Sequence, residues 1–111
     1  MKHIDFTVND KGTAEIVFNN NDLDVNLLSE KVLLGLESLL EEITENRDIK
    51  ILLFKSAKKD IFIAGADIKE IKALNTRDQA LDKVRQGRRI LSLIATLKIP
   101  TLAVIDGACL G

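Results

Sequence analysis

The residues Phe62-Ile63-Ala64-Gly65-Ala66-Asp67-Ile68-Lys69 form the stretch of this chain that says most about its fold. A short apolar strand is followed by a glycine and then by an acidic residue that opens a helical turn. Gly65 can take backbone angles that other residues avoid, so the chain can turn sharply there. The Asp67 carboxylate can accept from amides left unpaired at a helix start, which predicts a capped helix over 68–72.

The backbone amide of Ala66 lies on this predicted corner. We expect this N–H group to point toward a ligand rather than into a strand ladder. Amides near a helix start suit a negatively charged oxygen. The corner is therefore interpreted as half of an oxyanion hole, with a purely structural turn as the alternative.

Composition narrows the functional class. The 111 residues allow one domain at most, and 16 basic against 17 acidic residues give a net charge of -1 without a basic tract, which argues against a nucleic-acid or membrane surface. The single cysteine, Cys109, cannot form an intrachain disulfide and lies in an apolar run, so we expect a small buried side chain. One histidine and one cysteine cannot build a metal-ligand cluster. Without a signal sequence or an apolar run long enough to span a bilayer, a cytoplasmic protein is expected.

The last residues of the chain are unusually apolar. Residues 101–105 predict a strand buried on both faces, followed by a glycine-rich turn up to Gly111. Such a strand needs neighbours on both sides. We therefore expect residues 1–111 to be the amino-terminal part of a longer, incomplete domain.

Periodicity predicts the regular elements. Alternating residues over 4–8 and 14–18 flank the turn residues 9–12, which predicts a hairpin. With Ser29 as N-cap, an amphipathic helix is predicted to run to about Glu45. Its apolar face comprises Val32, Leu33, Leu36, Leu39, Leu40 and Ile43.

The second half of the chain repeats this alternation of strand and helix. Apolar strands are predicted at 50–54 and 61–63, and Thr76 with Gln79 forms a capping box for a helix that ends near Leu97. The single proline then opens the final strand. Long helical connections between buried strands favour parallel pairing, so the predicted fold class is α/β.

Two segments resemble signatures of the crotonase (enoyl-CoA hydratase/isomerase) superfamily. Residues 62–69 resemble its "AGADIK" corner, and the run from Ile99 to Gly111 resembles its next signature, in the same order. The resemblance covers essentially the whole chain. It implies a crotonase-like fold of repeated ββα units, of which the amino-terminal part is present.

Three shorter segments are most similar to the hydratase part of multifunctional fatty-acid oxidation alpha subunits. These are residues 22–29, 85–87 and 107–111. The resemblance implies a lyase that adds water to trans-2-enoyl-CoA in β-oxidation. It also implies that a 3-hydroxyacyl-CoA dehydrogenase part using NAD can follow, and that the protein is an oligomer that can pair with a thiolase beta subunit.

The resemblance also assigns site residues. In this family the acyl-CoA thioester oxygen lies between two backbone N–H groups, of which the first maps onto Ala66 and the second belongs to a glycine run that begins at Gly111. Two catalytic glutamates lie further downstream, so we expect the chain alone not to hydrate its substrate. Acyl-CoA is the expected substrate, with no bound cofactor and no metal. Coenzyme A contacts map onto Asp24, Val25, Asn26, Ala64, Gly65, Ala66, Ile68 and Lys69.

Other functions remain open at this point. Crotonase relatives include enoyl-CoA isomerases, thioester hydrolases, dehalogenases and decarboxylases, and a non-catalytic CoA-binding module is a further alternative. Four residues are given structural interpretations. Asp67 is expected to be a helix cap rather than a base, Glu70 a solvated charge, His3 part of an exposed strand, and Gly87 a site of close packing or bending.

Overall fold

The computed structural model describes residues 3–110 and contains one four-stranded sheet. Its strands are β1 (Ile4–Val8), β2 (Thr13–Phe18), β4 (Ile51–Ser56) and β7 (Thr101–Ala103), in the order β1-β2-β4-β7. The β1–β2 pair is an antiparallel hairpin, and the β2–β4 and β4–β7 pairs are parallel. Both the predicted hairpin and the predicted parallel pairing are therefore confirmed.

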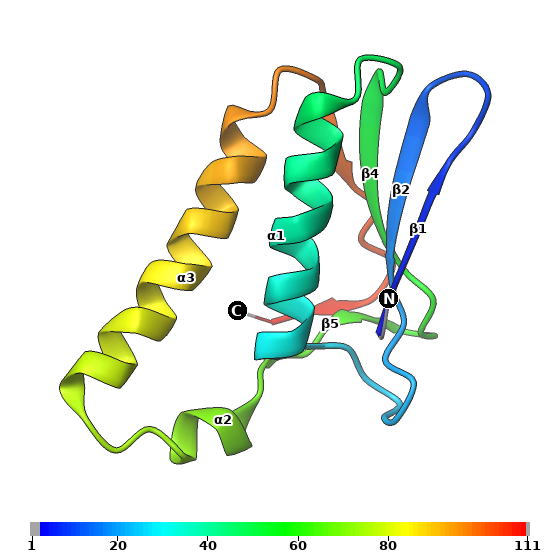
Figure 1. Cartoon of the computed structure of the whole chain (residues 1–111). Helices are drawn as coiled ribbons and strands as arrows, with labels where there is room; N and C mark the ends of the chain where they lie inside the picture. The colour runs from blue at the N-terminus through cyan, green and yellow to red at the C-terminus, as the bar shows by residue number, and fades with distance from the viewer. Residues whose placement is uncertain (1–2, 111) are drawn as a thin grey trace.

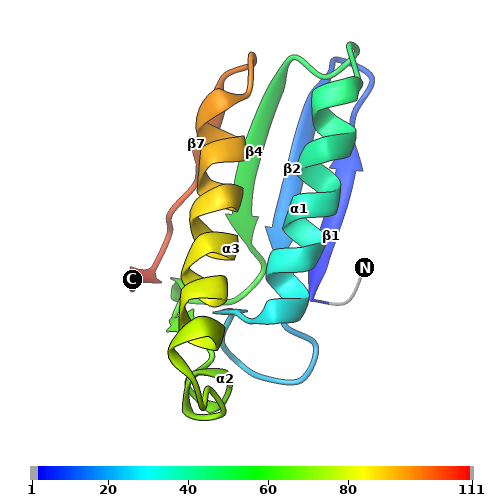
Figure 2. The same ribbon diagram turned by 60° about the vertical axis from the view of Figure 1, so that its left-hand side comes forward.

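Two long helices, α1 (Glu30–Glu45) and α3 (Arg77–Thr96), lie side by side on one face of this sheet (Figures 1 and 2). Ser29 caps α1, because its Oγ accepts from the Val32 N–H at 3.3 Å. Thr76 caps α3 by accepting from the Gln79 N–H at 3.2 Å. Both caps lie where the sequence predicted them.

The capping box of α3 differs in one detail from the expected form. Gln79 Oε1 accepts from the N–H of Asn75, one residue before the cap, at 2.8 Å.

Between the two helices, Arg89 Nε donates to Glu37 Oε2 at 2.8 Å, and this hydrogen bond raises the pKa of Arg89. The pair links the exposed surfaces of α3 and α1.

The core lies between the sheet and α1. In β2 alternate residues are buried, and Ile16 pairs in register with Phe54 of β4 on the same face. α1 packs against this face with five of its six predicted apolar positions fully buried; Leu33 is partly buried. The buried set is Ile4, Ala14, Ile16, Phe18, Val32, Leu36, Leu39, Leu40, Ile43, Ile49, Leu52, Phe54, Phe62, Ile63 and Ile90.

The sequence analysis did not predict two short parallel pairings that the structure shows. β3 (Leu27–Leu28) pairs with β6 (Gly65–Ala66), and β5 (Ile61–Ile63) pairs with β8 (Ala108–Cys109). α2 (Ile68–Lys72) follows β6 directly and has the bounds predicted for the segment after Asp67. These small elements hold the corner that the sequence singled out.

Two expectations about the end of the chain are wrong for the described residues. Residues 101–103 are exposed rather than buried, because β7 is the edge strand of the sheet and has one strand neighbour. Cys109 is also exposed, since β8 is covered by no further layer within residues 3–110. Over the same residues, every helix is too short or too polar to traverse a bilayer.

Candidate active site

The corner between β6 and α2 has the predicted backbone chemistry. Gly65 has a φ of 129°, a value that residues with a side chain rarely adopt. Asp67 caps α2, because its Oδ1 accepts from the Lys69 N–H at 2.9 Å. The sharp turn and the structural role of Asp67 are both confirmed.

Ala66 itself departs from one expectation. The residue lies in β6 and pairs in register with Leu28 of β3, so the corner belongs to a short ladder rather than standing free of one. This ladder forms because residues 27–28, which follow Asn26, run parallel to residues 65–66. β6 has β3 as its one strand neighbour among the described residues, which leaves its second edge without a ladder. The donor role of the Ala66 N–H stays a prediction.

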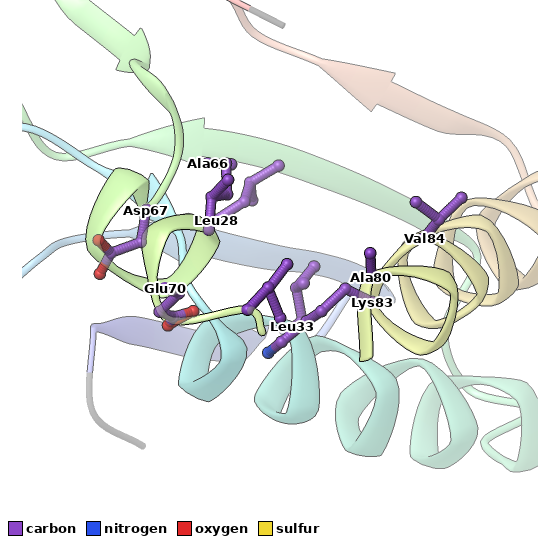
Figure 3. Close-up of a pocket in the computed structure, with 10 residues that line it drawn as sticks. Leu28, Leu33, Ala66, Asp67, Glu70, Ala80, Lys83 and Val84 are labelled. Carbon is purple, nitrogen blue, oxygen red and sulfur yellow. The ribbon is translucent and has the colours of Figure 1, made fainter. Parts of the chain in front are cut away.

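Ala66 lines a first cavity of about 360 Å³ between the corner and the helices (Figure 3). Most of the wall is apolar, and three charged side chains join it from α2, its cap and α3. The lining residues are Leu28, Leu33, Ala66, Asp67, Glu70, Ile71, Leu74, Ala80, Lys83 and Val84. This cavity can therefore hold an apolar group beside charged groups.

A second cavity of about 490 Å³ also reaches Ala66 and is almost wholly apolar. Three aromatic rings contribute to its wall: Phe18 stacks on Phe54 at 6.4 Å between centroids and meets Phe62 edge-on at 5.9 Å. Gly87 and Leu91 of α3 line it on the helix side. Ala66 thus lies where two apolar cavities share a wall, together with Leu28 and Leu33.

The β5–β8 pairing brings the end of the described chain to this corner. The Leu110 N–H donates to the Ile63 carbonyl at 2.9 Å, and the Ala108 N–H donates to the Asp60 carbonyl at 3.1 Å. Because the strands are parallel, β5 leads toward Gly65–Ala66 while β8 brings Leu110 to the same edge. Gly111 lies outside the described residues.

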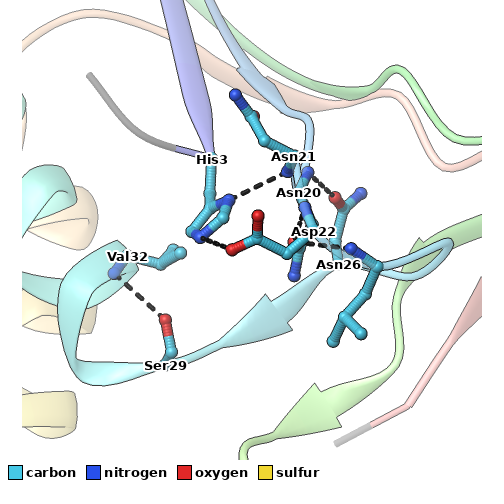
Figure 4. A network of polar contacts seen from close by, with 8 residues as sticks. His3, Asn20, Asn21, Asp22, Asn26, Ser29 and Val32 are labelled. Carbon is cyan, nitrogen blue, oxygen red and sulfur yellow. Dashed lines mark hydrogen bonds and ion pairs between the residues drawn. The ribbon is translucent and has the colours of Figure 1, made fainter.

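A buried asparagine connects the loop that precedes it to the corner; Figure 4 shows its hydrogen bond with Asn20 of that loop. Asn26 is 3% exposed, and its Nδ2 donates to Ser56 Oγ at 2.8 Å and to the Phe62 carbonyl at 2.9 Å. Its Oδ1 accepts from the Asn20 N–H at 3.0 Å, and its own carbonyl accepts from the Ala64 N–H at 2.8 Å. The Asn26 side chain therefore joins the loop, β4 and β5, and its main-chain carbonyl joins the corner.

A model of the enoyl-CoA hydratase/isomerase family matches residues 14–111. The chain belongs to the enoyl-CoA hydratase/isomerase family. Its fold is similar to that of an enoyl-CoA hydratase from Bacillus anthracis, with a TM-score of 0.85 and 26% identity, over 96% of this chain and 40% of that chain. An enoyl-CoA hydratase from Shewanella pealeana has a TM-score of 0.85 and 27% identity, over 95% of this chain and 39% of that chain. An enoyl-CoA hydratase from Mycobacterium smegmatis has a TM-score of 0.86 and 21% identity, over 95% of this chain and 40% of that chain.

These likenesses confirm the crotonase fold. The chain spans about 40% of the length of the solved structures that it matches. The described residues therefore present the amino-terminal region of the fold, and the β6–α2 corner lies at its lower end in Figure 1.

The coenzyme A positions that the family resemblance assigned lie in two groups. Asp24 is exposed, Val25 is half-buried and Asn26 is buried. The Asn26 side chain makes hydrogen bonds within the protein, for example to Ser56 Oγ. On the other side, Ile68 is 65% exposed and Lys69 is exposed. The Lys69 ammonium has no ion-pair partner within residues 3–110, and Ala64 is half-buried.

Two side chains in this family member differ from their sequence interpretations. Glu70 is not a solvated charge, because its Oε1 and Oε2 accept from the Glu30 N–H at 2.7 and 3.2 Å. His3 is not on an exposed strand: its side chain is 11% exposed, and Nδ1 accepts from the Asn21 N–H at 2.9 Å (Figure 4). Both contacts join residues far apart in sequence, so no local pattern could have revealed them.

Proposed function

We propose that the protein carrying this chain is an enoyl-CoA hydratase of fatty-acid β-oxidation, which adds water to a trans-2-enoyl-CoA. The observation that carries the proposal is the parallel β5–β8 pairing. It directs two segments toward one edge: the segment that contains Ala66 and the segment that leads to Gly111. In the family resemblance these two segments supply the donors of the oxyanion hole.

The chemistry proposed for this edge is polarisation of a thioester. The carbonyl oxygen accepts from the Ala66 N–H and from a second backbone N–H in the run that begins at Gly111. Charge moves onto this oxygen as water adds to C3 of the enoyl group, so an enolate is stabilised. A donor of this kind is typically worth about 10²- to 10³-fold in kcat. Two downstream glutamates place the water and move its proton.

The cavities on either side of Ala66 support an aliphatic acyl group as the apolar part of the substrate. For coenzyme A, we propose the backbone of residues 24–26 on one side and residues 64–69 on the other. Lys69 is exposed and its ammonium has no ion-pair partner among residues 3–110, which suits a phosphate of coenzyme A.

The decisive experiment is a hydration assay with crotonyl-CoA, followed by loss of the enoyl absorbance, on the complete protein and on the 111-residue chain. We expect turnover by the complete protein and none by the chain, which holds one proposed donor and neither glutamate. Double-bond migration or thioester cleavage instead of hydration would assign an isomerase or a thioester hydrolase. Coenzyme A binding without any turnover by the complete protein would assign a non-catalytic module.

The donor role of Ala66 is tested by replacing its amide with an ester, which removes the hydrogen and keeps the side chain. In the complete protein, kcat for hydration should fall about 10²- to 10³-fold. The matched control is the same replacement at Ala73, whose N–H donates to the Lys69 carbonyl at 3.1 Å at the end of α2. Equal losses at both positions would remove the assignment of Ala66.

The finer assignment is a multifunctional oxidation subunit. Residues 22–29 and 85–87 support it by similarity, and it places a dehydrogenase part using NAD after the hydratase part, a thiolase beta subunit as partner and the cytoplasm as location. NAD reduction by the complete protein after crotonyl-CoA hydration tests the dehydrogenase. Co-purification of thiolase activity tests the partner. A protein that hydrates crotonyl-CoA but passes neither test would be a single-function hydratase.

A further inference from the structure

The short helix α2 borders the first cavity without being fixed by core packing. None of its five residues is buried, and Ile68 and Ile71 are 65% and 54% exposed. In Figures 1 and 2 this helix lies at one end of the molecule, beside the first turns of α1 and α3. Polar contacts must therefore contribute much of what holds it in place.

One side chain of α2 reaches the first turn of α1. Both carboxylate oxygens of Glu70 accept from the N–H of Glu30, the first residue of α1, at 2.7 and 3.2 Å. The amides of a first helical turn lack partners within the helix, and the positive end of the helix dipole favours a carboxylate there. Glu70 thus acts as a cap supplied from another helix, 40 residues away in sequence.

The same point is tied to α3. The Glu30 carboxylate forms an ion pair with the Lys83 ammonium, with Oε2 and Nζ 3.1 Å apart. Glu70 and Lys83 both line the cavity that Ala66 lines (Figure 3). The starts of α1 and α2 and the first half of α3 therefore meet at a charged junction on the wall of the proposed acyl cavity.

We propose that Glu70 is a positioning residue, which holds α2, and with it the Ala66 corner, against the start of α1. α2 begins two residues after Ala66, and only the capping residue Asp67 separates them. A displacement of α2 therefore moves the direction of the Ala66 N–H and changes the cavity wall. The effect on catalysis rests on the proposed hydratase function, whereas the effect on α2 does not.

The test compares Glu70→Ala, Glu70→Gln and the control Glu42→Ala in the complete protein. Glu42 is an exposed glutamate in the last turn of α1, at the opposite end of the helix from Glu30. In Glu70→Ala, amide hydrogen exchange at Glu30 and over residues 68–72 should rise about tenfold, while exchange in the middle of α3 stays unchanged. Glu70→Gln keeps one acceptor oxygen and should recover part of the protection. Unchanged exchange at Glu30 and in α2 in Glu70→Ala would overturn the proposal.

The catalytic readout separates positioning from general stability. At a temperature where all variants are folded, Glu70→Ala should lower kcat for crotonyl-CoA about tenfold, with a smaller change in KM. The vibrational shift of the bound thioester carbonyl, which reports hydrogen bonding by the oxyanion hole, should shrink in parallel and recover partly in Glu70→Gln. Raised exchange in α2 with unchanged kcat and carbonyl shift would reduce Glu70 to a helix cap and refute its effect on the corner. If the wild-type protein shows no turnover, the hydratase proposal fails while the exchange data still decide the role of Glu70.

Discussion

The strongest test of how this corner is built is the removal of the Asn26 side chain. Asn26 is 3% exposed and lies between the loop, the end of β4 and the carbonyl that precedes the corner. In Asn26→Ala, the Phe62 carbonyl and Ser56 Oγ lose a donor and the Asn20 N–H loses its acceptor. The hydrogen bond from the Ala64 N–H to the Asn26 carbonyl survives, because it involves the main chain.

The size of the effect follows from these three lost bonds. A lost side-chain hydrogen bond costs about 1 kcal/mol net, and where it leaves a buried partner unsatisfied the cost is instead about 2 kcal/mol, within a range of roughly 1 to 3 kcal/mol. The substitution leaves the Asn20 amide, in a residue that is 8% exposed, and the Phe62 carbonyl without these partners. We therefore expect a loss of about 3 to 5 kcal/mol, a large part of the roughly 5 to 15 kcal/mol that stabilises a typical domain.

The measurement is urea unfolding of the chain followed by far-UV circular dichroism. Asn21→Ala is the matched control, because Asn21 is exposed and contributes its main-chain N–H to this network. Asn26→Asp should also be destabilised, since a carboxylate keeps the acceptor for the Asn20 N–H but cannot donate to Phe62. A loss below about 1 kcal/mol for Asn26→Ala, at an unchanged m value, would refute the reasoning.

Three further substitutions probe the turns and helices around the site. Gly107→Ala would bring a methyl group into a steric clash with the Asp60–Ile61 backbone, so a loss of about 1 to 3 kcal/mol is expected in urea unfolding. A wild-type midpoint would show that the two backbones do not approach so closely. Gly87→Ala meets no atom within 4 Å and lies inside a helix, so thermal unfolding should show a gain of up to about 1 kcal/mol, and a loss would indicate a steric role. Asp67→Ala removes the cap on the Lys69 amide and should cost about 1 kcal/mol, whereas Asp67→Asn should be close to neutral; equal losses would argue against capping.

The long elements were predictable because each carries many copies of the same periodic signal. α1 and α3 span 16 and 20 residues, and their starts are marked by Ser29 and Thr76, whose side chains accept from amides three residues on. The hairpin was predictable for the same reason, since alternating residues on both sides of a turn are compatible with a single pairing register. β3, β6 and β8 are two residues long, too short for any period to be recognised.

Within the site, the sequence revealed what is local. The positive φ of Gly65 and the Asp67 cap each follow from residue chemistry within two positions. By contrast, Glu70 and Asn26 take partners 30 to 40 residues away, which only the packing of α1 against the sheet brings near. Gly87 was expected to mark close packing or a bend, and the structure excludes the close packing, because no atom lies within 4 Å of where its Cβ would be. A glycine inside a helix can equally mark the wall of a cavity, as it does here.

The proposed oxyanion edge depends on the β5–β8 pairing, whose few backbone hydrogen bonds contribute little stability on their own. β8 contributes two residues, and such a short strand has little stability alone. What fixes its register is the close approach of Gly107 to the Asp60–Ile61 backbone, together with the β4–β7 pairing that delivers the chain to this point. The Val104 N–H donates to the Phe54 carbonyl at 2.8 Å, so the path from the sheet edge to β8 starts from a fixed position. A bulky residue at position 107 would therefore be felt beyond the turn, because it would carry Leu110 away from Ile63 and separate the two segments proposed to share one substrate oxygen.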